Sequence, residues 1–246
     1  SPDREASLLG QGFTVFFTVL LCAIGAVAVL LSWDYVKRTR IHHGEYYALL
    51  LCATLGMMFM AGANDLITMF LGLELMSLSL YVLVGFRRGS LESSEAGLKY
   101  FLLGAFASGF LLYGIALLYG ATGTTSLPRM AAFLAGSPLR DSPLLLVGGL
   151  LLLSGLLFKV AAVPFHMWTP DAYEGAPTSV TAFMSVGAKA AAFAALLRFA
   201  LRALGDVPVA WGPVLSVIAV LTMTVGNVTA LLQTNLKRML AYSSIA

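Results

Sequence analysis

The sequence predicts an all-α protein, a polytopic bundle of transmembrane helices with a discontinuous helix near Pro164. Of the 246 residues, 59% are apolar and 11% are charged, whereas a water-soluble domain has about 45–50% apolar residues. The mean hydropathy is +0.88. The apolar residues also form uninterrupted runs close to the roughly 20 residues that a helix needs to cross a bilayer. These three observations place the chain in lipid.

Eight apolar runs follow one another along the chain. They cover residues 11–33, 46–64, 66–86, 100–119, 144–165, 177–197 and 207–232, and an unfinished run starts at residue 239. Each should be a helix, because hydrocarbon offers backbone groups no hydrogen-bond partner and the runs are too uniformly apolar for barrel strands. We therefore expect about seven full spans and a partial eighth in a single transmembrane domain, residues 1–246, that is a fragment.

The connections between the spans give two further expectations. Little more than Asn64 and Asp65 separates the second and third runs, which leaves room only for a tight pair of antiparallel helices. The longest connection, residues 120–143, is rich in Thr, Pro, Gly and Ser and is typical of an ordered surface loop. No linker to a second domain is apparent.

Several classes of protein are excluded by composition and motifs. A net charge of +3 is too small a surplus for a nucleic-acid binder. The sequence contains no phosphate-binding GxxxxGK[ST], no dinucleotide-binding GxGxxG and no Cys/His ligand spacing. We therefore expect no nucleic-acid partner, no metal site and no cofactor-binding residues in this chain, with the lipid bilayer as its surroundings.

Three charged residues lie deep inside apolar runs, namely Glu74, Lys159 and Lys189. A charge at the centre of a membrane helix costs about 2.5–3.5 kcal/mol, so each needs a polar partner, a wet cavity or neutralisation. One interpretation is structural, with ion pairs that hold helices together or a lysine that reaches to the headgroups. The other is a proton or ion relay, which three such residues on three helices favour.

The residue types suit a relay. A lysine or glutamate in a low dielectric can shift its pKa by about 3–5 units toward neutrality, where protons exchange readily. A carboxylate and an ammonium about 7 Å apart attract each other by roughly 2.4 kcal/mol at an effective dielectric of about 20. Moving or neutralising one charge would therefore change the protonation of the other.

Pro164 lies five residues after Lys159 and removes a helical hydrogen bond, so the helix should be kinked or interrupted beside the lysine. Such breaks line ion routes in transporters, although they also serve packing alone. On composition alone, His166 is an interfacial histidine. Lys99, next to Tyr100 near the start of the fourth run, is on the same basis an anchor at the membrane surface.

One long motif, FKVAAVPFHMWTPDAYEGAPTSVTAFMSVGAKAAAFAALLRF, starts at Phe158. Two others are GANDLITMFLGLELMSLSLYVLVGFRR and LKYFLLGAFASGFLLYGIALLYGATGTT. Together they resemble the antiporter-like membrane subunits of respiratory complex I, most closely its subunit N branch, over nearly the whole chain.

The resemblance implies an inverted-repeat fold with a broken helix in each repeat, the first around residues 46–200 and the second beginning around 207–246. It implies a proton relay of Glu74, Lys159 and Lys189, with Lys99 and His166 as secondary candidates and Pro164 at the helix break. In that family two further helices come first and the rest of the second repeat follows, so the resemblance implies that the proton exit lies outside this sequence.

The resemblance also implies a function. The chain would be a proton-translocating subunit of NADH:quinone oxidoreductase in a bacterial plasma membrane, with other membrane and peripheral subunits as partners. NADH, FMN, iron–sulfur clusters and quinone would belong to those partners, and this chain would hold no redox centre. The alternatives are a cation/proton (Na⁺/H⁺) antiporter module and a structural membrane subunit whose buried charges only fix helix packing.

Overall fold

The structure is a computed structural model that describes residues 2–39, 44–137, 142–202 and 211–246, without the side chains of 2–9 and 136. All regular secondary structure in these ranges is helical. The prediction of an all-α protein is confirmed.

Each predicted run corresponds to a helix, although the helices Pro2–Arg38 and Leu91–Thr122 begin nine residues before their runs. Their bounds are α1 Pro2–Arg38, α2 Gly44–Gly62, α3 Leu66–Val84, α4 Leu91–Thr122, α5 Leu127–Gly136, α6 Pro143–Val160, α7 Trp168–Gly175, α8 Thr178–Phe183, the π-helical turn η2 Met184–Ala188, α9 Lys189–Arg202, α10 Trp211–Leu231 and α11 Leu236–Ile245. Within the described ranges, seven segments are long and apolar enough to cross a membrane, with α8, η2 and α9 forming one of them. The predicted partial eighth span corresponds to α11.

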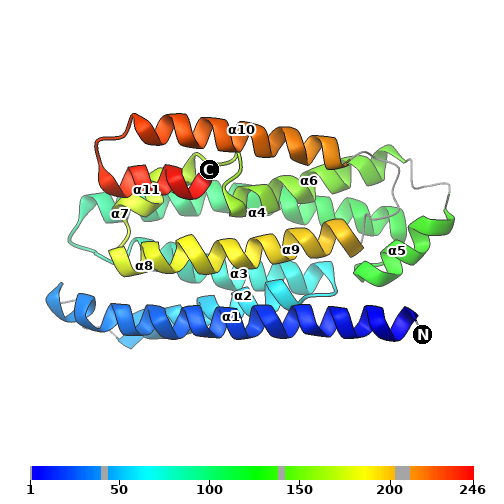
Figure 1. Ribbon diagram of the computed structural model, residues 1–246, viewed down its shortest axis with the longest axis horizontal. Coiled ribbons are helices and arrows are strands. Elements are labelled where there is room, and N and C mark those ends of the chain that lie inside the picture. The colour runs from blue at the N-terminus through cyan, green and yellow to red at the C-terminus, as the bar shows by residue number, and fades with distance from the viewer. Residues whose placement is uncertain (1, 40–43, 138–141, 203–210) are drawn as a thin grey trace.

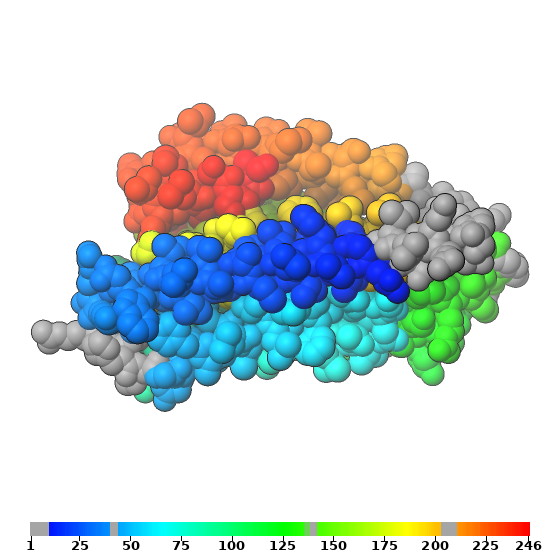
Figure 2. Space-filling view, turned by 60° about the horizontal axis from the view of Figure 1, so that its bottom comes forward, coloured from blue at the N-terminus to red at the C-terminus, as the bar shows by residue number. Residues whose placement is uncertain are grey.

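The helices pack as a single elongated bundle. Figure 1 shows α1 and α10 on opposite sides, with α2, α3, α4, α6 and α9 between them. The most extensive contacts join α2 to α3 and α4 to α6, while α7 packs on α4 and α11. Figure 2 shows α1 lying along the surface beside α2 and α3. The candidate residues Glu74 and Lys159 lie on α3 and α6, which have the largest buried shares among the spans that the structure describes.

The predicted pair of antiparallel helices is α2 and α3. Asp65 caps α3, since its carboxylate accepts hydrogen bonds from the backbone of Ile67 at 2.9 Å and of Thr68 at 3.3 Å. The two helices touch backbone to backbone at glycines. A Cβ at Gly72 would lie 2.6 Å from the Met60 nitrogen, so no larger residue fits without displacement.

The predicted discontinuity is present and begins before Pro164. Helix α6 ends at Val160, where Ala161 takes a left-handed conformation with φ of 63°. Helix α7 starts at Trp168, so Pro164 lies in the connection between the two. The fifth predicted span therefore stops at Val160, five residues earlier than expected. The left-handed conformation of Ala161, the next residue, prevents the helix from continuing.

Two local features differ from the expectations. The connection at residues 120–143 contains a ten-residue helix, α5, preceded by Ser126 and with Pro128 in its first turn. The π-helical turn η2 directly precedes Lys189, and the sequence gives no signal for it. Such turns insert an extra residue into a helix and thereby change the direction of the side chains that follow.

Candidate functional site

Lys159 lies in the last turn of α6 and is only 4% exposed. Its ammonium donates a hydrogen bond to the Tyr81 hydroxyl at 3.4 Å. The same nitrogen lies 5.2 Å from the centre of the Tyr81 ring, 5.3 Å from that of Tyr100 and 5.6 Å from that of Phe158. We call these three rings the aromatic cage. Aromatic faces attract a cation within about 6 Å, so the cage favours the charged form of the lysine.

Glu74 lies in the middle of α3 and is half-buried. Its carboxylate accepts a hydrogen bond from the Ser108 hydroxyl on α4. It is also close enough to Lys159 and Tyr81 for an electrostatic interaction with both. Among the residues that the structure describes, no salt bridge within 4.0 Å joins Glu74 to Lys159. The carboxyl and the ammonium group therefore lie near each other without direct contact.

Lys189 is the first residue of α9 and is partly buried. Its ammonium donates a hydrogen bond to the backbone carbonyl of Ser244 on α11. No contact with Glu74 or Lys159 is found in the described part of the chain. The structure thus brings Glu74 and Lys159 into one group and places Lys189 apart from them, against α11.

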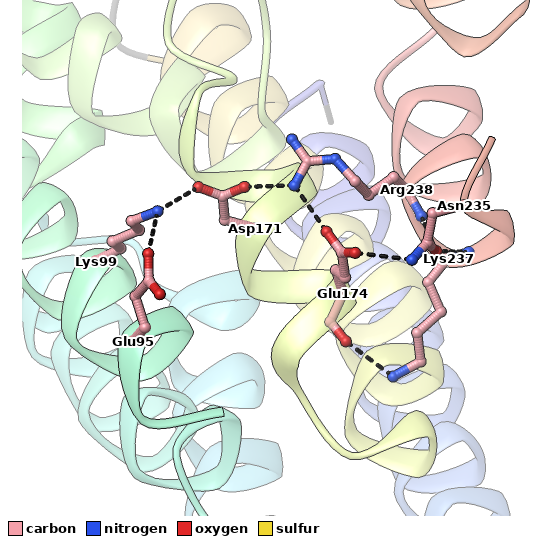
Figure 3. Close-up of polar contacts among 7 residues, drawn as sticks. All are labelled: Glu95, Lys99, Asp171, Glu174, Asn235, Lys237 and Arg238. Carbon is pink, nitrogen blue, oxygen red and sulfur yellow. Dashed lines mark hydrogen bonds and ion pairs between the residues drawn. The ribbon is translucent and has the colours of Figure 1, made fainter. Parts of the chain in front are cut away.

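Lys99 lies on α4 and belongs to a cluster of charged side chains that is shown in Figure 3. Its ammonium pairs with Glu95 at 2.7 Å and with Asp171 of α7 at 3.0 Å. The Lys99 and Glu95 side chains are about half exposed, so the Glu95 pair contributes little stability. In this structure Lys99 acts as a link between α4 and α7.

The same cluster continues into α11. Arg238 contacts Asp171 at 2.6 Å and Glu174 at 2.7 Å through one guanidinium nitrogen. The Asn235 amide donates to Glu174 at 2.7 Å, and the Lys237 ammonium donates to the Glu174 carbonyl at 3.1 Å. These contacts join α4, α7 and α11 in a charge network of Glu95, Lys99, Asp171, Glu174, Asn235, Lys237 and Arg238 (Figure 3).

Asp171 is the centre of this network. Partial burial raises the pKa of its carboxyl, but hydrogen bonds from Arg238 and Lys99 outweigh that effect and hold the pKa below its usual range. The hydrogen bond to Glu174 in turn raises the pKa of Arg238. Both residues therefore stay charged at neutral pH.

His166 lies in the connection between α6 and α7 and is half-buried. Burial lowers the pKa of its imidazole below 6.5, and a hydrogen bond with the Pro164 backbone opposes that shift. Its Nδ1 atom has no hydrogen-bond partner among the described residues. His166 is therefore mainly neutral at pH 7, and it has no described contact with Glu74, Lys159 or Lys189.

The sequence profile of the family described as NADH:quinone oxidoreductase/Mrp antiporter, TM, matches residues 63–246. The chain belongs to this transmembrane family. It is 57% identical over 240 residues to NADH-quinone oxidoreductase subunit N of Trichlorobacter lovleyi, covering 98% of this chain and 49% of the relative. The chain thus spans about half the length of the curated relatives that it matches.

Two solved structures share the fold of this NADH:quinone oxidoreductase/Mrp antiporter family member. Respiratory complex I from Thermus thermophilus matches with a TM-score of 0.78 and 45% identity, over 96% of this chain and 49% of that one. An archaeal membrane-bound sulfane sulfur reductase matches with a TM-score of 0.83 and 31% identity, over 95% of this chain and 47% of that one. Together with the seven apolar spans in the described part of the chain, the family membership establishes an integral, multi-pass membrane protein.

Sequence reasoning missed several polar residues in this family member. Asp171 and Glu174 lie three residues apart and therefore on one face of α7, which is the signal that could have paired them with a cation. The partner, Arg238, lies more than sixty residues away and has no local signal. No group of three or more His, Cys, Asp or Glu side chains in the described ranges could hold a metal ion.

Proposed function

We propose that this chain is part of a proton-translocating membrane subunit of NADH:quinone oxidoreductase. In this proposal Glu74, Lys159 and Lys189 pass protons through the membrane interior, and Lys99 and His166 assist. The observation that carries the proposal is the buried Lys159 ammonium, held in an aromatic cage within electrostatic range of Glu74 but without a salt bridge to it.

The chemistry follows from the cost of charge in a low dielectric. An ammonium in the membrane interior needs compensation, and Glu74 supplies part of it as long as the carboxylate is ionised and nearby. When Glu74 is protonated or moves away, the ammonium loses that attraction and releases its proton more readily. A direct salt bridge would hold the proton too firmly, so the gap between the two groups suits transfer.

The next step would lead to Lys189. Its only described hydrogen bond goes to a backbone carbonyl, so no carboxylate holds its proton in place. A proton leaving Lys159 could reach Lys189 through water, and helix breaks such as the one after Val160 expose backbone carbonyls that hold water in transporters. The exit from Lys189 would use parts of the relatives' length that this chain does not span.

The energy would come from partner subunits. We propose that peripheral subunits transfer electrons from NADH through FMN and iron–sulfur clusters to quinone, while this chain holds no redox centre. The setting would be a bacterial plasma membrane. The name of the Trichlorobacter lovleyi relative, at 57% identity, supports complex I. The sulfane sulfur reductase, at 31% identity, is more distant in sequence.

The test is NADH-driven proton pumping by the assembled complex that contains the full-length protein. Lys159→Ala should abolish most pumping, because the alanine cannot carry a proton. Lys37→Ala is the control, since that lysine lies near the end of α1 against an exposed tryptophan. Normal pumping in Lys159→Ala would contradict the proposal and favour a structural role for the buried charges.

A second measurement separates complex I from an antiporter module. Flavin and iron–sulfur subunits should copurify with the full-length protein from its native membrane. Sodium-dependent proton exchange without NADH oxidation would instead identify a cation/proton antiporter.

A further inference from the structure

Trp168 contacts two of the three rings that surround Lys159. It is the first residue of α7 and is 3% exposed. Its indole stacks on the Tyr100 ring with centres 4.4 Å apart and planes at 11°, and it packs against Phe158 at 5.5 Å. Trp168 therefore forms a second layer behind the aromatic cage.

A hydrogen bond fixes the indole in this position. Its Nε1–H donates to the backbone carbonyl of Phe158 at 2.9 Å. That carbonyl lies in the last turn of α6, where helical carbonyls lack their usual partners. It also accepts from the Ala161 nitrogen at 3.1 Å, so the Trp168 bond uses its second lone pair. The segment after the helix break is thereby tied to the residue that precedes Lys159.

We propose that Trp168 is a positioning residue that sets the aromatic cage and thereby the ease with which Lys159 gives up its proton. The inference rests on the proposed function and adds a residue to it. The stacked indole prevents the Tyr100 ring from turning away, and the bond to the Phe158 carbonyl fixes the backbone that carries both the third ring and the lysine.

The cage acts on only one protonation state of Lys159. The ring faces attract the ammonium cation, and the attraction is strongest where the cation and the rings are removed from water. A neutral amine gains little stabilisation from the same rings. The titratable groups that face Lys159 are Glu74 and Tyr81 on α3 and Tyr100 on α4. A loosened cage therefore weakens the hold on the proton while the attraction of Glu74 stays.

The experiment compares pH profiles of NADH-driven pumping in the assembled complex. Trp168→Phe keeps a ring but loses the N–H donor, and Trp168→Leu loses both. In both variants the alkaline limb of the profile should move to lower pH, by about one unit in Trp168→Leu, equivalent to a tenfold weaker hold on the proton. Trp33→Phe is the control, because the Trp33 ring contacts Lys37 at 4.5 Å on the exposed surface of α1.

The outcomes distinguish this inference from the proposed function. An unmoved alkaline limb in both Trp168 variants, with pumping lost in Lys159→Ala, overturns the role of Trp168 and leaves the relay intact. Normal pumping in Lys159→Ala overturns the relay itself. If neither Trp168 variant assembles, Tyr100→Leu removes a cage ring directly, and an unmoved limb in that variant also overturns the proposal.

Discussion

The charge network predicts that Arg238 stabilises the fold more than an ordinary surface arginine does. The perturbation is Arg238→Gln, which keeps the approximate size and removes the charge. It deletes two ion pairs at 2.6 and 2.7 Å, with Asp171 and Glu174. The three side chains are only about one-third exposed, so solvent screens them less than it screens a fully exposed pair.

The magnitude follows from this geometry. Exposed ion pairs contribute about 0.2–1 kcal/mol each, and hydrogen bonds to charged groups about 1.5–3 kcal/mol. Two partly exposed contacts to one guanidinium should together contribute about 1–2 kcal/mol to the free energy of unfolding. Arg38→Gln is the matched control, because Arg38 pairs with Asp34 at 2.7 Å with side chains 79% and 65% exposed. That pair should contribute about 0.3–0.5 kcal/mol.

The assay is thermal unfolding of the purified full-length protein in mild detergent. Arg238→Gln should lower the apparent Tm several times more than Arg38→Gln at pH 7. Asp171 has a folded-state pKa below its ordinary value of 3.8, so its contribution is present above that value and disappears as the pH falls through the lowered pKa. The difference should therefore be constant between pH 8 and 5. Equal effects of the two substitutions at pH 7 would refute this reasoning.

Two further predictions concern the surroundings of Lys159. Glu74→Gln should lower NADH-driven pumping severalfold in the assembled complex, and Glu74→Asp should retain more of it, because only the aspartate keeps a charge; equal pumping in the two variants would contradict this. Gly104→Ala should also lower pumping, since its Cβ would lie 2.6 Å from the Tyr81 Cζ atom and would push that ring from the lysine. Gly109→Ala, whose Cβ would meet nothing within 4 Å, is the control, and equal pumping in both alanine variants would show that the Tyr81 position is unimportant.

Much of the fold could be predicted from the sequence, because hydropathy alone decides which segments cross a bilayer. The short Asn64–Asp65 connection specified the pairing of α2 with α3, and Pro164 marked the discontinuous helix. The exact end of α6 was not predictable, since it depends on the left-handed conformation of Ala161. The helix α5 was missed because its ten residues are too short and mixed for a span.

The candidate site was only partly accessible to such reasoning. Glu74, Lys159 and Lys189 became candidates because charged residues are rare inside apolar runs. That rarity is a local property, which can be read from the sequence. The surroundings of the three residues depend on contacts between helices. The aromatic cage brings Tyr81, Tyr100 and Phe158 together from three helices, and single aromatic residues in a membrane helix give no signal of such convergence. Arg238, the partner of Asp171, was found only in the structure, because that pair also depends on a contact between helices.

The central claim is that Glu74 and Lys159 act as one proton-transferring unit. The most direct measurement is the number of protons pumped per NADH oxidised in Glu74→Gln, Lys159→Met and the double variant of the full-length protein. If the two residues form a unit, the double variant should lose no more pumping than the more severe single variant. Losses that multiply in the double variant would mean that the two residues act independently, and would contradict the account.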